Sequence, residues 1–201
     1  MQRQTLLLNC FCGISGIAAF TVLLNFAKPV QALPDQSVQT VMQWAKQHHV
    51  LSPLRRGISE LGNLPFYTSE GTLKTGKIVF SMSPDRNDRQ VRKETIVANN
   101  SQKSEGFTRT NVNSLNVIEQ IYNQTIATDF RQSKYIAQVR YNHQTVRFYR
   151  GESFGYITTD FTPISTSDKY YNHFTILPLN ELNREISFQQ QCSQQSLDGC
   201  E

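Results

Sequence analysis

Lys134–Thr159, KYIAQVRYNHQTVRFYRGESFGYITT, contains three short segments in which apolar and polar side chains alternate. A period of two is typical of β-strands. Asn142 and Gly151 interrupt the alternation, and both residue types are common where a hairpin turn needs positive φ. The stretch therefore predicts three antiparallel strands joined by two tight turns.

Three helices are expected around this meander. Residues 113–130 directly precede it and carry apolar side chains three and four residues apart, which predicts an amphipathic helix. A helix with the same spacing is expected near the N-terminal side, after a cap at Asp35 or Ser37. A short final helix is expected over residues 180–188.

Further strands are predicted where the period of two returns. These strands cover residues 76–82, 92–98 and 173–177. Residues 54–67 contain two glycines and a proline among scattered apolar residues, so we expect an irregular connection there. Because neighbouring strands are linked too briefly for parallel crossovers, we expect an α+β domain with a mainly antiparallel sheet of about five strands, and one or two helices packed on one face.

The segment SPDRNDRQVRKE, residues 83–94, is dense in charges of both signs. We interpret it as a solvated hairpin tip. A calcium loop is not favoured, because Arg89 occupies a ligand position and the required Gly and distal Glu are missing.

The N-terminus has the pattern of an export signal. Thr5–Ala27 has no charged residue and is rich in apolar residues, with a basic residue on each side. Val30–Ala32 offers a cleavage site, so residues 1–32 are expected to be a signal peptide and residues 33–201 a single globular domain. An uncleaved membrane anchor is the alternative, because about 20 apolar residues suffice to span a bilayer.

The cysteines and histidines bear on location and on metals. Cys192 and Cys200 remain after removal of the signal peptide, and an even number of cysteines in an exported protein predicts a disulfide between them. From the export signal, the protein is expected to be periplasmic or secreted. Neither the cysteines nor the four scattered histidines have metal-ligand spacing, and no metal or cofactor is expected.

Charge provides one candidate binding surface. After residue 32 the chain has 18 basic and 16 acidic residues, a balance that does not indicate a nucleic-acid partner. Residues 131–150, however, contain five basic residues and no acidic one. The predicted arginine patch consists of Arg140, Arg147, Arg150, Tyr141 and Tyr149. It would bind an acidic protein, an anionic lipid or a polysaccharide; alternatively, its arginines face solvent or pair with acids of the C-terminal third.

The sequence contains only weak matches to catalytic motifs. Gly151–Gly155 has the outline G-x-S-x-G, but a nucleophilic serine of this type needs a strand that leads into a helix, whereas Ser153 lies in a predicted strand-turn-strand unit. Glu152 and Asp160 are the acids nearest the meander, and nothing else marks them. We therefore expect an exported accessory protein that works by binding. The alternatives are an exported hydrolase with an unrecognised acid pair or histidine site, and an assembly component anchored in the membrane by Thr5–Ala27.

Overall fold

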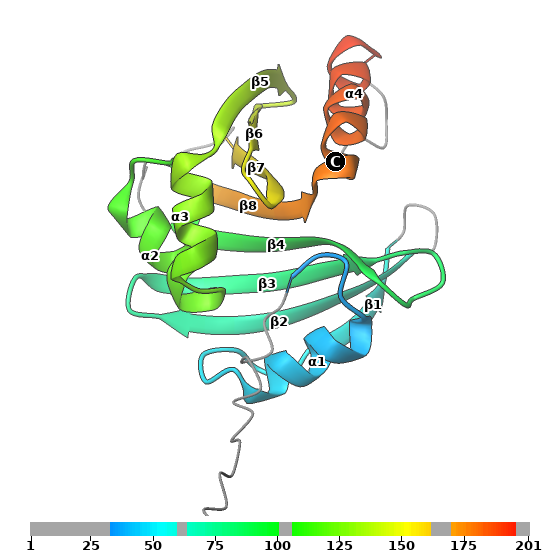
Figure 1. The fold of residues 1–201 in the computed structure, drawn as a ribbon, viewed down its shortest axis with the longest axis vertical. Coiled ribbons are helices and arrows are strands. Elements are labelled where there is room, and N and C mark those ends of the chain that lie inside the picture. Colours follow the sequence, from blue (N-terminus) through cyan, green and yellow to red (C-terminus); the bar gives the residue numbers. More distant parts are fainter. Residues whose placement is uncertain (1–32, 60–63, 101–105, 162–169, 196–201) are drawn as a thin grey trace, which may run out of the picture.

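The computed structural model describes residues 33–59, 64–100, 106–161 and 170–195. These residues form four helices and eight strands, and all the strands belong to one antiparallel sheet (Figure 1). The helices are α1 (Val38–Gln47), α2 (Val112–Ile121), α3 (Gln124–Gln132) and α4 (Leu179–Gln195). The strands are β1 (Arg55–Ile58), β2 (Pro65–Leu73), β3 (Gly76–Pro84), β4 (Val91–Asn100), β5 (Lys134–Tyr141), β6 (Gln144–Arg150), β7 (Phe154–Phe161) and β8 (Tyr170–Pro178).

The sheet consists of two meanders. Its strand order is β1-β2-β3-β4-β8-β7-β6-β5, so the last strands of the two meanders, β4 and β8, pair in the middle. Helix α1 precedes the first meander, and the pair α2 and α3 precedes the second. The two halves of the chain thus repeat one order of elements within a single sheet.

The predicted α+β class with an antiparallel sheet is confirmed, but its details are wrong. The sheet has eight strands instead of about five, and helices cover both of its faces. Side chains of α1, α2 and α3 join the larger core on one face, which we call the helical face. Helix α4 packs on the opposite face, where Leu182 joins Phe148, Ile157 and Leu177 in a second core.

The two strands missed by the sequence pattern are β1, which lies within the residues expected to be irregular, and β2, which begins at the end of them. The inward positions of β2 carry Tyr67, Ser69, Gly71 and Leu73. A small polar residue and a glycine therefore occupy buried positions, and the apolar alternation does not show in the sequence. The Ser69 hydroxyl is satisfied locally, because it lies 3.3 Å from the Ser52 hydroxyl.

The predicted central meander is confirmed by the pairing of β5 with β6 and of β6 with β7. Asn142 and His143 have φ values of 42° and 60°, which is the left-handed pair required by a two-residue type I′ turn. Gly151 in the next turn serves a different purpose. A Cβ there would lie 2.5 Å from Asp129 Oδ2, so the absence of a side chain lets α3 approach this turn.

The helix predicted over residues 113–130 is two helices. Helix α2 ends at Ile121, and the side chain of Asn123 accepts a hydrogen bond of 2.9 Å from the Ile126 N–H. This contact is an N-cap, which starts α3 as a new helix. The apolar stripe continues across the break through Ile118, Ile121, Ile126 and Phe130, all of them buried, and this continuity explains the single predicted helix.

The interpretation of residues 83–94 as a solvated tip is wrong at its C-terminal end. Strand β3 extends to Pro84 and β4 begins at Val91, so the turn is shorter than expected. Glu94 lies on the helical face of β4 and is fully buried. Its neighbours Arg92 and Lys93 pair with Glu181 and Glu185 of α4.

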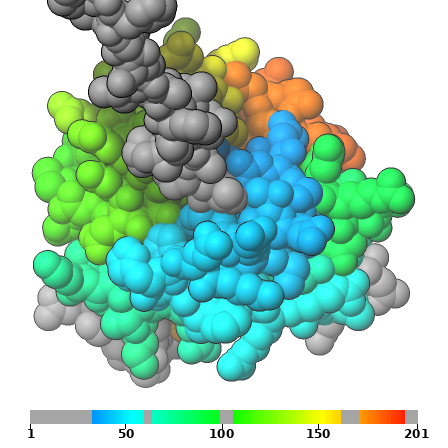
Figure 2. All heavy atoms as spheres, turned by 60° about the horizontal axis from the view of Figure 1, so that its bottom comes forward, coloured from blue at the N-terminus to red at the C-terminus, as the bar shows by residue number. Residues whose placement is uncertain are grey.

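Aromatic side chains pack α1 and α3 against the sheet. The ring centroid of Phe130 in α3 lies 5.6 Å from that of Tyr149, 5.4 Å from Tyr156 and 4.9 Å from Phe174. These partners come from β6, β7 and β8. Helix α1 is attached through Trp44, whose ring lies 5.4 Å from Phe80. Figure 2 shows this helical layer from outside, with α1 in blue and the residues of α2 and α3 in yellow-green beside it.

Two predictions fall wholly or partly outside the described residues. The expected signal peptide, residues 1–32, is one of them; within the described ranges, no helix is long and apolar enough to cross a membrane. The other is the disulfide. Cys192 is buried on α4, which runs past the predicted end at 188 to Gln195, but Cys200 lies beyond the described part of the chain.

Candidate functional site

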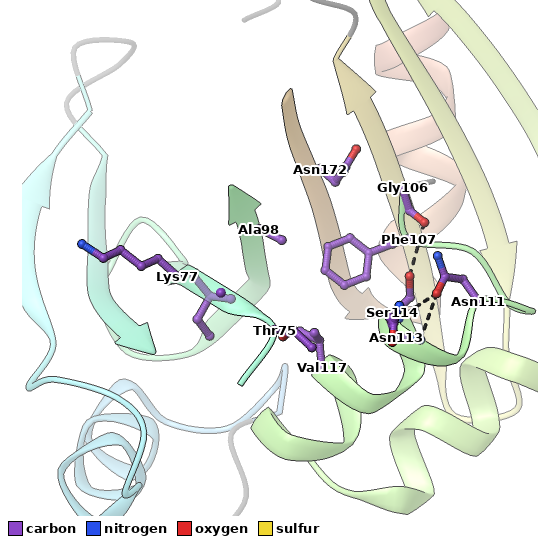
Figure 3. Close-up of a pocket in the computed structure, with 12 residues that line it drawn as sticks. Thr75, Lys77, Ala98, Gly106, Phe107, Asn111, Asn113, Ser114, Val117 and Asn172 are labelled. Carbon is purple, nitrogen blue, oxygen red and sulfur yellow. Dashed lines mark hydrogen bonds between the residues drawn. The ribbon is translucent and has the colours of Figure 1, made fainter. Parts of the chain in front are cut away.

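A pocket lies at the end of the sheet where the β2–β3 turn, β4, β8 and the first turns of α2 meet (Figure 3). Its volume is about 300 Å³. Its apolar lining includes Ile78, Ala98, Phe107 and Val117. Its polar lining includes Thr75, Asn111, Asn113, Ser114 and Asn172.

A row of paired residues across three neighbouring strands forms the floor of the pocket. Ile78 of β3 pairs with Ala98 of β4, and Ala98 pairs with Asn172 of β8. Because paired residues point to the same face of a sheet, all three side chains lie on the helical face. The small side chain of Ala98 in the middle of this row leaves space between the larger side chains of Ile78 and Asn172.

The first turns of α2 form the wall opposite the floor. Asn111 caps the helix, and its Oδ1 accepts hydrogen bonds from the N–H groups of Asn113 at 2.9 Å and Ser114 at 3.3 Å. The Ser114 hydroxyl donates to the Gly106 carbonyl at 3.3 Å. These bonds fix the helix end, and they occupy the backbone N–H groups that would otherwise attract an anion.

Gly106 brings the segment before α2 very close to the sheet. A Cβ on this residue would lie 1.7 Å from Asp160 Oδ1 and 3.1 Å from Asn172 Oδ1, so any other residue type would displace the Asp160 side chain. Asp160 is held in turn by an ion pair with Arg147. The back of the pocket therefore contacts Asp160 near the end of β7, and the ion pair connects it to the middle of β6.

Phe107 gives the pocket a fixed apolar wall. It is buried, and its ring centroid lies 5.5 Å from that of Phe174 in the core. Figure 3 shows the ring at the centre of the site, between the strand that carries Ala98 and the start of α2. A wall anchored in the core is already in place before a ligand arrives.

The pocket is almost neutral. Lys77 is the one charged side chain among the described lining residues, and Figure 3 shows it extending away from Phe107. The other polar groups are amides and hydroxyls, which donate and accept hydrogen bonds without net charge. The described lining contains no Asp, Glu, His or Cys. Such an arrangement can orient a small ligand, and it offers no carboxylate, imidazole or thiol to a reaction.

The structure divides the predicted arginine patch between the two faces of the sheet. Arg140 and Arg147 share the helical face, because Arg140 pairs with Thr145 two residues from Arg147. Tyr141 and Arg150 point to the opposite face, where the Tyr141 hydroxyl donates to Gln189 of α4. The five residues therefore do not form one surface.

Two members of the patch are committed to contacts within the fold. Arg147 pairs with Asp160, an acid of the C-terminal third, as the alternative interpretation expected. Tyr149 is buried against Phe130, and the Arg109 guanidinium lies over its ring at 5.3 Å. Arg140 is the exposed member on this face.

Of the residues considered for hydrolysis, Ser153 and Glu152 lie in the β6–β7 turn, whereas Asp160 lies on β7 and pairs with Arg147. Ser153 is exposed between β6 and β7, in the predicted strand-turn-strand context, and its N–H donates to Asp129 at 3.3 Å. Glu152 is exposed in the same turn. Within the described residues, no three His, Cys, Asp or Glu side chains are grouped to hold a metal ion.

The pocket residues were not singled out in the sequence. They come from the β2–β3 turn, from the segment before α2 and from β8, which are far apart along the chain. The one local signal is Asn111, an N-cap residue two positions before the expected helix start. Comparisons of the chain with models of protein families, with curated proteins and with solved structures found no match.

Proposed function

We propose that this protein is an exported binding protein without catalytic activity, and that it holds a small molecule with uncharged polar groups in the pocket between α2 and the sheet. The observation that carries the proposal is the lining of the pocket. Apolar walls surround a few amides and two hydroxyls, as in most small-molecule sites.

The size of the pocket limits the ligand. Sites for drug-sized molecules measure roughly 300–1,000 Å³, and this pocket lies at the lower end at about 300 Å³. Hydrogen bonds from Asn111 and Asn172 would orient the polar end of the ligand, and Phe107 and Val117 would contact its apolar part. The exposed Lys77 at the margin would tolerate a single negative charge there.

Export is the part of the proposal that depends on sequence alone. Its support is the uncharged Thr5–Ala27 segment and the cleavage pattern at Val30–Ala32. A location outside the cytoplasm would suit a protein that captures a small molecule. It would also permit the disulfide between Cys192 and Cys200.

A second candidate function is contact with an acidic partner through what we call the basic edge, Lys134 and Arg150. These residues are register partners on β5 and β6, and both are exposed. Like charges directly opposite each other on a sheet are unfavourable, and an anionic partner would relieve the repulsion. This candidate retains Arg150 of the arginine patch but not Arg147.

The pocket proposal is tested by filling the pocket. We expect the native mass of the protein, purified from its own cells under gentle conditions, to include a small added mass that is lost on denaturation. In Ala98→Leu the longer side chain extends into the pocket from its floor, and the added mass should disappear. Val97→Leu is the matched control, because Val97 lies on the same strand and faces the other side of the sheet.

The results for the two variants and the wild type decide whether the ligand binds in this pocket. Loss of the added mass in Ala98→Leu, with retention in Val97→Leu and similar melting temperatures for the two variants, supports the pocket. An added mass retained by Ala98→Leu would place the ligand elsewhere. Wild-type protein without any added mass would overturn the proposal.

A further inference from the structure

Glu94 is a carboxylic acid in the middle of the core. It lies on β4 between Met82 of β3 and Ile176 of β8, on the helical face, and it is fully buried. Neither carboxyl oxygen has a hydrogen-bond partner among the described residues. A buried charge in such surroundings is very unfavourable, so the fold favours the protonated acid.

Tyr122, at the C-terminal end of α2, is the polar residue that faces Glu94. It is buried, it contacts the ring of Phe80 with centroids 6.3 Å apart, and its hydroxyl has no hydrogen-bond partner among the described residues. Burial raises the pKa of Glu94 to about 8, although the interaction with Tyr122 opposes this rise. Burial and the neighbouring Glu94 raise the pKa of Tyr122 as well.

The other titratable groups around this site supply no neutralising charge. Strand β7 contributes Tyr156, whose hydroxyl donates to Asp129 of α3 at 2.7 Å. Helix α1 contributes His48 near the end of α2, and burial lowers the pKa of this imidazole. On β2, the Tyr67 hydroxyl donates to Asp88 at 2.9 Å. No described Lys, Arg or His forms an ion pair with Glu94.

The same helix and the same strand connect Glu94 with the pocket. Helix α2 carries Ser114 and Val117 in the pocket lining, and Tyr122 follows its last turn over Glu94. Strand β4 carries Ala98 in the pocket floor, four residues from Glu94 on the same face. Any displacement of α2 from β4 would therefore change both places at once.

We propose that a proton on Glu94 holds α2 against the sheet and keeps the pocket formed, and that loss of this proton loosens α2 and weakens ligand binding. The inference deepens the proposed function and rests on it. Strand β4 cannot move away, because it is hydrogen-bonded to β3 and β8. Helix α2 is held to the sheet by side-chain packing, so its movement is the easier way to bring water to the carboxylate.

The direction of the pH effect follows from the two states. When α2 is displaced, the solvated Glu94 returns to its ordinary pKa of 4.5, whereas in the closed state it holds its proton to about pH 8. Between these values the closed state binds more protons, so displacement becomes roughly tenfold easier with each pH unit. Above pH 8 both states have lost the proton, and the effect levels off.

Hydrogen exchange of the α2 amides tests this inference without a ligand. In the wild-type protein, the protection factors of residues 112–121 should fall roughly tenfold per pH unit from about pH 5 to pH 8, after correction for intrinsic exchange. In Glu94→Gln they should be constant, because Gln has the shape of the protonated acid and cannot ionise. Glu70→Gln, which changes an exposed acid on β2, should behave as wild type.

Three results would overturn the inference. The first is the same pH dependence in the wild type and Glu94→Gln. The second is an equal loss of protection in β6 and β7 between about pH 5 and pH 6.5, where the opposing titration of His173 keeps the global stability level. This result would indicate global unfolding rather than movement of α2. The third comes from Tyr122→Phe, which keeps the ring and removes the hydroxyl that favours the carboxylate. The upper end of the transition should move to higher pH in this variant, and an unmoved transition would contradict the assigned role.

A failure of this inference is distinguishable from a failure of the proposed function. If the wild-type protein has no added mass at any pH, the binding proposal fails, while the exchange experiment still reports on Glu94. If the added mass is present and is lost between about pH 5 and pH 8 in the wild type but kept in Glu94→Gln, the proton and the pocket are coupled. Equal loss in both proteins would exclude the coupling.

Discussion

The Tyr156 hydroxyl donates a hydrogen bond of 2.7 Å to Asp129 Oδ2 and so links the buried surface of β7 to α3. The same carboxylate accepts the backbone N–H groups of Glu152 at 2.7 Å and of Ser153 at 3.3 Å. One aspartate therefore fixes the β6–β7 turn against the helix. Burial and this hydrogen bond raise the pKa of Tyr156, so the phenol remains a donor throughout the physiological pH range.

Replacing Asp129 with Asn should destabilise the protein, because a neutral amide accepts these hydrogen bonds more weakly than a carboxylate does. We expect a loss of roughly 1.5 to 3 kcal/mol in the free energy of unfolding, and about 1 kcal/mol for Tyr156→Phe, which removes one bond. Glu119→Gln, at an exposed position on α2, is the control and should change stability by less than about 0.5 kcal/mol. Chemical denaturation measures all three, and Asp129→Asn with the stability of the control would show that the turn needs no carboxylate.

The basic edge leads to a prediction about retention on an anionic matrix. Lys134→Gln with Arg150→Gln should weaken retention without destabilising the fold, because these exposed side chains repel each other. Arg147→Gln is the informative comparison. It removes the partner of Asp160, so it should lower the denaturation midpoint and leave retention nearly unchanged. Equal retention by the wild type and the double variant would show that the basic edge is an ordinary solvated surface.

The contrast between Arg147 and Arg150 illustrates what the sequence can predict. The alternation in residues 134–159 correctly predicts the strands and turns, and the positive φ of Asn142 follows from the same pattern. Which face of the sheet is covered, and by which helix, depends on contacts between distant segments. Arg147 and Arg150 look equivalent along the chain. Arg147, however, lies half-buried on the helical face and pairs with Asp160, whereas Arg150 is exposed on the opposite face.

Glu94 and the pocket escaped prediction for related reasons. Glu94 follows Arg92 and Lys93, and three consecutive charges normally indicate solvent exposure. The two basic residues are instead neutralised by α4, whose contact with β4 no local pattern reveals. The pocket is lined by amides, hydroxyls and small apolar side chains that are common throughout the chain. Its residue types carry no signal until the fold assembles them.

Two groups whose pKa values burial shifts within the range from about pH 4 to pH 8, Glu94 and His173, act on stability in opposite directions. Glu94 has a pKa of about 8 in the fold because it is buried, against 4.5 ordinarily. The folded protein therefore holds an extra proton between these values, and stability falls as the pH rises through them. Burial lowers the pKa of His173 from 6.5 to about 4. Here the unfolded chain binds the extra proton, and stability falls as the pH decreases from 6.5 to 4.

These opposing contributions predict a plateau of stability between about pH 4.5 and pH 6.5, where the two slopes cancel. From pH 6.5 to pH 8 Glu94 acts alone, and the free energy of unfolding should fall by about 2 kcal/mol, at 1.36 kcal/mol per pH unit. Denaturation midpoints measured across this range should show the fall in the wild type and not in Glu94→Gln. His173→Gln should lose the plateau and show a continuous fall in stability from about pH 4.5 to pH 8, because the slope that opposes the Glu94 slope is removed. A wild-type protein that becomes more stable from pH 6.5 to pH 8 would mean that Glu94 is already ionised in the folded protein. The carboxylate beneath α2 would then have to be stabilised by water or by polar groups in the core.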